Sequence, residues 1–110
     1  MLVADARGGA VISRLWHGRT SRAQADAYLA FLVERALPDY RGTPGNRGAW
    51  ILRRDEGEVT HFSTLSFWES RAAIEAFAGA DISVAKYYPE DAGFLLEFEP
   101  TVVHAEAYGG

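Results

Sequence analysis

The stretch from Ser66 to Phe77 constrains the fold of this chain more than any other. It reads Ser-Phe-Trp-Glu-Ser-Arg-Ala-Ala-Ile-Glu-Ala-Phe, so a β-rich segment passes into a helical pattern with almost no loop. Residues 59–68 alternate in polarity and are rich in β-branched and aromatic side chains, which predicts a strand. Ser70 can then cap a helix in which Ile74 and Phe77 recur on one apolar face. The sequence therefore predicts a strand that leads directly into an amphipathic helix.

The first half of the chain predicts another strand followed by a helix. Residues 10–16 alternate in polarity, which is typical of a strand. Ser21 and Gln24 form a capping-box pair, and an apolar stripe continues until Pro38, which we expect to end the helix. The stripe consists of Ala25, Tyr28, Leu29, Leu32 and Ala36. We expect residues 39–46 to form a turn-rich loop.

The remaining segments complete the pattern of strands. Residues 48–54 predict a strand that pairs with residues 58–68 through a tight turn at Asp55-Glu56-Gly57. Beyond the second helix we expect a helical turn at residues 81–86, a loop at 87–91, a fourth strand at 94–99 and a peripheral fifth strand at 101–108.

The order strand, helix, strand, strand, helix, strand predicts an α+β fold of the ferredoxin-like βαββαβ type, with an antiparallel sheet and helices on one face. A chain of 110 residues encloses a single core. We therefore expect one domain over residues 10–110, preceded by a flexible segment at residues 1–9.

The strand at residues 59–68 carries apolar side chains on both of its sides. Val59, Leu65 and Phe67 share one side, while Phe62 and Trp68 share the other. Because helices on one face cover only one of these sides, the pattern predicts a homodimer in which two sheets pack face to face. The alternative is a monomer that exposes several aromatic side chains.

Charge and composition exclude several classes of partner. The net charge is −4 and no basic run exceeds Arg53-Arg54, which argues against nucleic acid. There is no cysteine and no apolar run long enough for a signal peptide or a membrane span, so we expect a cytoplasmic protein without a membrane partner. His17, His61 and His104 lack metal-ligand spacing, and no nucleotide motif is present, so we expect no metal and no cofactor.

Several short segments within residues 10–108 match the pattern of one known family. They are Trp16-His17-Gly18-Arg19-Thr20, Asp39-Tyr40-Arg41, Thr43-Pro44-Gly45-Asn46-Arg47-Gly48, Phe67-Trp68-Glu69-Ser70, Ala73-Ile74, Ala76-Phe77-Ala78-Gly79, Tyr87-Tyr88-Pro89-Glu90-Asp91 and Phe94-Leu95-Leu96-Glu97. In these segments the chain resembles the antibiotic biosynthesis monooxygenase family of dimeric α/β-barrel proteins. The resemblance implies a homodimer with one cavity per subunit, between the sheet and the helices.

The resemblance also implies oxygenation without a cofactor, in which a phenolic or enolisable substrate is deprotonated to an anion that reacts with O₂. That chemistry needs a base, a donor for the anion and an aromatic pocket. His61 and His17 are the candidate bases because imidazole titrates near neutral pH. The alternative for each of them is a purely structural role. The candidate pocket residues are Arg14, Trp16, Tyr40, Trp50, Phe62, Phe77, Tyr87 and Tyr88, and Arg47 joins Arg14 and Tyr40 as a candidate anion donor. For the tryptophans, packing in the core or in the dimer is the alternative.

Haem degradation is a further alternative that the resemblance raises. Members with that activity carry an asparagine, a tryptophan and a histidine haem ligand where this chain has Ser13, Phe77 and Lys86. A protonated lysine is a poor haem ligand, so we expect no haem chemistry.

Two function classes remain: a monooxygenase of a small aromatic substrate, such as a phenol, a quinol or a polyketide-like molecule, and a non-catalytic dimeric module that binds a small apolar ligand. A titratable group beside open volume would favour the enzyme, and a wholly aromatic pocket would favour the binding module. The carboxylates of Asp55-Glu56 and Glu90-Asp91 lie in predicted turns, where we expect them to be solvated.

Overall fold

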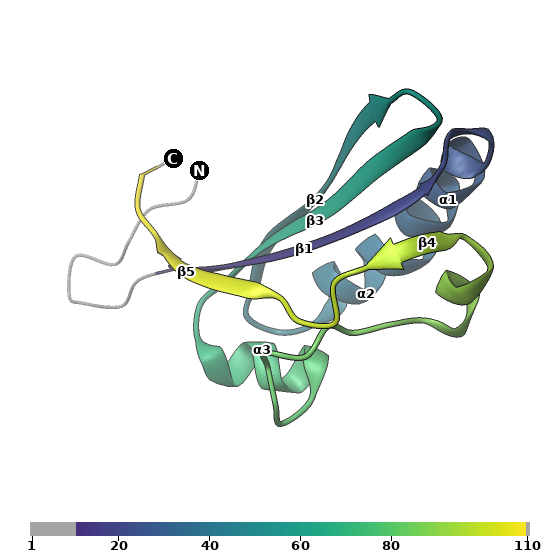
Figure 1. Ribbon diagram of the computed structural model, residues 1–110. Helices are drawn as coiled ribbons and strands as arrows, with labels where there is room; N and C mark the ends of the chain where they lie inside the picture. Colours follow the sequence, from purple (N-terminus) through teal and green to yellow (C-terminus); the bar gives the residue numbers. More distant parts are fainter. Residues whose placement is uncertain (1–10, 110) are drawn as a thin grey trace.

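The computed structural model describes residues 11–109, so the predicted flexible segment at residues 1–9 lies outside the described residues. Five strands form one antiparallel sheet in the described part, in the order β2-β3-β1-β4, with β5 also paired to β1 (Figure 1). The strands are β1 (Val11–Ser21), β2 (Asn46–Glu56), β3 (Val59–Trp68), β4 (Leu95–Phe98) and β5 (Val103–Ala107). The helices are α1 (Ala25–Phe31), α2 (Leu37–Gly42) and α3 (Arg71–Ala78). This arrangement confirms the predicted ferredoxin-like α+β fold.

β1 lies at the centre of the sheet and has a different partner on each side. It pairs with β3 from Ile12 to Ser21. On its other side β5 covers Val11–Leu15 and β4 covers Gly18–Thr20, so these two short strands follow one another along a single edge (Figure 1). The predicted first strand was too short, because β1 continues to Ser21.

β2 and β3 form the predicted hairpin, but the turn lies further along the chain than expected. Glu56 pairs with Val59, which leaves Gly57 and Glu58 as the two turn residues. Gly57 occupies the first turn position with φ of 58°, a conformation that glycine adopts without steric cost.

Alternation along β1 and β3 gives the sheet two different faces. The buried residues Thr60, Phe62, Thr64, Ser66 and Trp68 on β3, and Ile12, Arg14, Trp16 and Thr20 on β1, form the helix-covered face. All three helices pack on this face, since Tyr28 of α1 contacts Phe62, and Trp68 contacts both Tyr40 of α2 and Phe77 of α3. The opposite side, which we call the open face, exposes the large apolar side chains of Leu15, Trp50, Leu52 and Val103.

The first helix does not end at Pro38 as predicted. A π-helical turn at Leu32–Ala36 follows α1, and the Leu37 N–H donates to the Leu32 carbonyl five residues earlier. Pro38 consequently lies in the first turn of α2, where its missing N–H is not needed. The helical path continues to Gly42, so the predicted loop at residues 39–46 is confined to its second half.

The segment between α3 and β4 also differs from its prediction. Residues 81–86 form a turn and an isolated bridge between Val84 and Thr101, with no helical turn. The predicted loop gives way to a short 3-10 helix at Pro89–Gly93. The start of α3 is confirmed, because the Ser70 side chain accepts a hydrogen bond from the backbone N–H of Ala73. No helix in residues 11–109 has the length and apolar character needed to cross a membrane.

Candidate functional site

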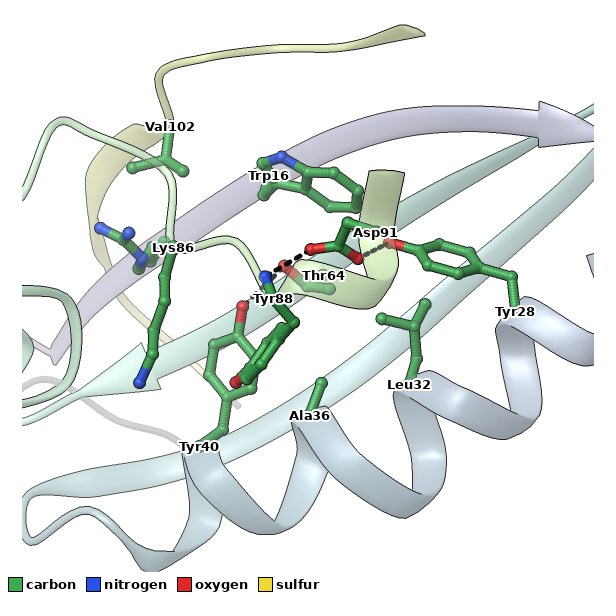
Figure 2. Close-up of a pocket in the computed structure, with 11 residues that line it drawn as sticks. Trp16, Tyr28, Leu32, Ala36, Tyr40, Thr64, Lys86, Tyr88, Asp91 and Val102 are labelled. Carbon is green, nitrogen blue, oxygen red and sulfur yellow. Dashed lines mark hydrogen bonds between the residues drawn. The ribbon is translucent and has the colours of Figure 1, made fainter. Parts of the chain in front are cut away.

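A cavity lies between the helix-covered face and the helices (Figure 2). Strands β1 and β3, the helical path from α1 to α2, and the segment between α3 and β4 all contribute to it. Its lining consists of Arg14, Trp16, Tyr28, Leu32, Ala36, Tyr40, Thr64, Lys86, Tyr88, Asp91 and Val102. The volume open to the centre of a water-sized sphere is about 20 Å³, which is room for one or two water molecules. A larger molecule therefore fits only if part of the lining moves.

Arg14 brings a buried positive charge to the cavity from β1. Its side chain is 2% exposed. One Nη1 hydrogen bond goes to the Ile82 carbonyl at 2.6 Å and another to His104 Nε2 at 3.0 Å, and Nη2 donates to the Val84 carbonyl at 3.1 Å. Burial lowers the pKa of Arg14, although a guanidinium stays protonated in proteins. Burial and the nearby Arg14 charge lower the pKa of His104, which is therefore a neutral acceptor.

Asp91 brings a buried carboxyl group to the same cavity. It is 6% exposed, and its Oδ1 accepts a hydrogen bond from the Tyr28 hydroxyl at 2.9 Å while its Oδ2 accepts one from the Tyr88 backbone N–H at 2.7 Å (Figure 2). Burial raises the pKa of Asp91, and these two hydrogen bonds only partly offset that effect.

The prediction that Glu90 and Asp91 are both solvated was wrong for Asp91. The 3-10 helix at Pro89–Gly93 turns Asp91 inward to bind the Tyr88 N–H, while Glu90 stays at the surface and pairs with Arg35 at 2.7 Å. The spacing of Tyr88-Pro89-Glu90-Asp91 carried a signal for this, because proline in a first helical turn and aspartate at its third position are typical of a capped start.

Asp39 of α2 binds the segment that carries Lys86, Tyr88 and Asp91, which we call the covering segment. The same Asp39 oxygen accepts hydrogen bonds from Lys86 Nζ at 2.8 Å and from the Tyr88 hydroxyl at 2.5 Å. Burial raises the pKa of Asp39, but the hydrogen bonds from Lys86 and Tyr88 together lower it below its usual value. The Lys86 ammonium also lies 4.3 Å from the centre of the Phe77 ring. The Lys86 ammonium is thus bound by Asp39 and by the Phe77 ring.

Three tyrosine hydroxyl groups surround the cavity. Burial raises the pKa of Tyr28, Tyr40 and Tyr88, so all three are protonated at neutral pH. The Tyr40 hydroxyl is hydrogen-bonded to Thr64 Oγ1 at 3.0 Å. Figure 2 shows Tyr40 on the same helical path as Leu32 and Ala36, which form the helical wall.

The predicted pocket residues divide into two groups. Arg14, Trp16, Tyr40 and Tyr88 line the cavity. The others do not line it. Phe62 and Phe77 are buried in the core, and Tyr87 accepts a hydrogen bond from Trp16 Nε1. Trp50 lies on the open face, and the candidate anion donor Arg47 pairs with Glu69 at the surface.

His17 and His61, the predicted bases, meet on the open face. His17 Nε2 lies 2.9 Å from His61 Nδ1, and the rings stack with their centres 5.1 Å apart. The outer nitrogen atoms point to carboxylates, at 3.5 Å from Glu99 for His17 and 3.4 Å from Glu56 for His61. The pair borders a shallow hollow of about 300 Å³ on the side of the sheet away from the cavity. Over residues 11–109, no three histidine, aspartate or glutamate side chains gather as metal ligands.

Solved structures share this fold over almost the whole chain. Two are from proteins described as putative antibiotic biosynthesis monooxygenases: one from Bacillus cereus (10% identity, TM-score 0.60, 93% of this chain and 99% of that one covered) and one from Chloroflexus aurantiacus J-10-fl (17%, 0.57, 92% and 96%). A third, of unknown function, is from Nitrosomonas europaea (18%, 0.62, 94% and 95%). The chain thus has the ferredoxin-like fold of antibiotic biosynthesis monooxygenase structures. No family model and no curated protein matches its sequence.

Proposed function

We propose that the protein is a cofactor-independent monooxygenase that oxidises a small aromatic substrate, a phenol, a quinol or a polyketide-like molecule, in the cavity between sheet and helices. The observation that carries the proposal is the buried Asp91 carboxyl group beside a cavity with aromatic walls. A titratable group in this position distinguishes a reactive site from a purely apolar binding pocket.

Asp91 supplies the base that this chemistry needs. A carboxylate whose pKa is raised by burial is a stronger base than a solvated one. It takes the O–H proton of the phenol or enol, and the resulting anion reacts with O₂ at a ring carbon that carries one hydrogen. That carbon loses its hydrogen and gains one oxygen atom as a carbonyl, and the substrate oxygen becomes a second carbonyl. The other oxygen atom of O₂ leaves as water with the two hydrogens. O₂ is the sole oxidant required.

The cover of the cavity controls access in this proposal. Since the cavity has room only for water, the segment that carries Lys86, Tyr88 and Asp91 moves away before a substrate binds. The hydrogen bonds from Lys86 and Tyr88 to Asp39 are the contacts that opening breaks. Closure then excludes bulk water from the anion.

We also propose that the open face is the homodimer interface. Leu15 and Trp50 flank Leu65 on adjacent strands, and Val103 pairs with Leu15 on β5, so their side chains form one apolar patch across four strands. Packing of two such faces removes this patch from water.

The second candidate is a non-catalytic dimeric module that binds a small apolar ligand. The observation that favours it is that both Asp91 oxygens already accept hydrogen bonds. Under this reading Asp91 fixes the covering segment to α1 and takes no part in chemistry.

O₂ uptake separates the two candidates. A panel of phenols, quinols and enolisable aromatic ketones is tested without added flavin, metal or nicotinamide, and thermal shift reports binding in parallel. We expect Asp91→Asn to lower kcat/KM by about 10²-fold or more, and its surface neighbour Glu90→Gln to retain wild-type activity. An unchanged rate and pH profile in Asp91→Asn would show that Asp91 is not the base. The His17–His61 pair would then be the candidate base, which His61→Ala tests. Ligands that stabilise the fold without any O₂ uptake above autoxidation would establish the binding module.

A further inference from the structure

The histidine pair on the open face has contacts that the proposed oxidation does not use. His17 Nε2 and His61 Nδ1 lie 2.9 Å apart, and the second nitrogen of each ring faces a glutamate. The four side chains form a row in the order Glu99, His17, His61 and Glu56. They come from the segment after β4, from β1, from β3 and from the end of β2, so the fold of the chain brings them together.

Hydrogen-bond chemistry determines how many protons this row holds. The contact between the two rings takes one proton, because one nitrogen has to donate and the other has to accept. A carboxylate only accepts, so each outer nitrogen is satisfied when it carries a proton of its own. Hydrogen bonds from Arg54 and His61 lower the pKa of Glu56, which keeps it an acceptor. The two rings then hold three protons, one more than two neutral imidazoles, and the pair has a single positive charge.

The arginines close to the pair already have carboxylate partners. Arg19 and Arg54 lie opposite His61 on the strands at either side of β3. In residues 11–109 the groupings without net charge are Arg19 with Glu97, Arg54 with Glu56, and Arg22 and Arg53 with Asp26 and Asp55. Glu99 has no arginine or lysine partner in this range, so its negative charge remains. One proton shared by the two histidines balances that charge.

We propose that the His17–His61 pair takes up a proton from solution when two open faces associate, so that acid favours the homodimer and a rising pH weakens it. An unbalanced carboxylate is costly to bury in an interface, and the proton removes the imbalance. The pair adjoins the apolar patch, because Leu15 is two residues from His17 on the same face and Leu52 borders the same hollow as both rings. This inference rests on the proposed dimer interface and adds its regulation by pH.

Analytical ultracentrifugation of a dilution series between about pH 6 and pH 8 tests the proposal. Imidazole changes charge in this range, whereas ordinary glutamate and arginine side chains do not. Each subunit takes up at most one proton, so the dissociation constant of the dimer rises by at most about 10²-fold per pH unit. We expect it to rise by about tenfold or more over the whole range.

Two substitutions test the source of this dependence. His61→Gln keeps a donor and an acceptor but has no titration, so its dissociation constant should change by less than about twofold over the same range. Glu99→Gln removes the charge that the proton balances and should abolish or reverse the dependence. The matched control is Glu34→Gln, an exposed carboxylate on the helical side of the sheet, which should behave as wild type.

A wild-type dissociation constant that stays constant or falls as the pH rises would overturn the inference and leave the homodimer. A wild-type protein that sediments as a single chain at every pH would overturn both. Full wild-type dependence in a folded His61→Gln or Glu99→Gln would refute the role of the pair. None of these results involves O₂ uptake, which tests the monooxygenase separately.

Discussion

The two faces of the sheet place titratable side chains in different environments. On the helix-covered face Arg14 and Asp91 are almost fully buried and have only neutral hydrogen-bond partners. On the open face, His17 and His61 bind each other and lie near glutamates that are more than half exposed. Since burial, more than residue type, makes a titratable group reactive, the comparison favours the carboxyl group over the histidines.

A single strand supplies both environments. Arg14 and Trp16 of β1 point to the cavity, whereas Leu15 and His17 point to the open face. Successive side chains of a strand alternate between the faces of its sheet, so neighbours in the sequence belong to chemically different surfaces.

The largest expected effect is on the stability of the helix-covered face. Phe77 is 5% exposed and stacks on Tyr40 with the ring centres 4.4 Å apart. We expect Phe77→Ala to lower the free energy of unfolding by about 3 to 5 kcal/mol, because it leaves a cavity in the core. Urea denaturation measures this. The matched control is Trp50→Ala on the open face, where a dilute monomeric sample should lose less than about 1 kcal/mol.

The next effect concerns association through the open face. We expect a homodimer at micromolar concentration, and Trp50→Asp should weaken it by about 2 kcal/mol or more, because it places a charge in an apolar interface. Analytical ultracentrifugation gives the dissociation constant. A wild-type sample that sediments with the mass of one chain at this concentration would refute the dimer.

A smaller effect is expected on the pH dependence of stability. Because burial raises the pKa of Asp91 above its unfolded value of about 3.8, the folded protein binds this proton more tightly. The resulting stabilisation is complete below that unfolded value and is lost as the pH rises through the folded pKa. Asparagine has no such proton, so the stability of wild type relative to Asp91→Asn should decrease from acid to neutral pH. Urea midpoints at several pH values test this, and a difference that increases with pH would contradict it.

The smallest expected effect is that of haemin, for which we expect no stoichiometric complex and no ascorbate-driven bleaching. Lys86, which stands where the resemblance to haem-degrading proteins would require a histidine ligand, is paired with Asp39 and lies over Phe77. A titration followed at the Soret band tests this. A tight one-to-one shift with release of a product would contradict it.

The sequence predicted those helices and strands whose formation depends on residues close together in the chain. The capped start of α3 and the alternation of β3 follow from sequence spacing alone, and four of the eight predicted pocket residues line the cavity. For Asp91 the local spacing indicates only the capping contact with Tyr88, because its other partner, Tyr28, lies 63 residues away and is brought close by tertiary packing. The contact between His17 and His61 likewise depends on the register of two strands, which alternation does not determine.

The π-helical turn at Leu32–Ala36 lets the helical path hold one more residue without turning the cavity wall. Such a turn contains one residue more than regular helix needs, so Leu37 bonds to Leu32 although five positions separate them. Deletion of the exposed Val33 would make this the regular four-residue separation and leave Tyr40 facing Thr64. The effect would fall on Pro38, which would then lie in regular helix, where proline is unfavourable. A relative one residue shorter here would therefore keep the same cavity wall and would need another residue at the position of Pro38.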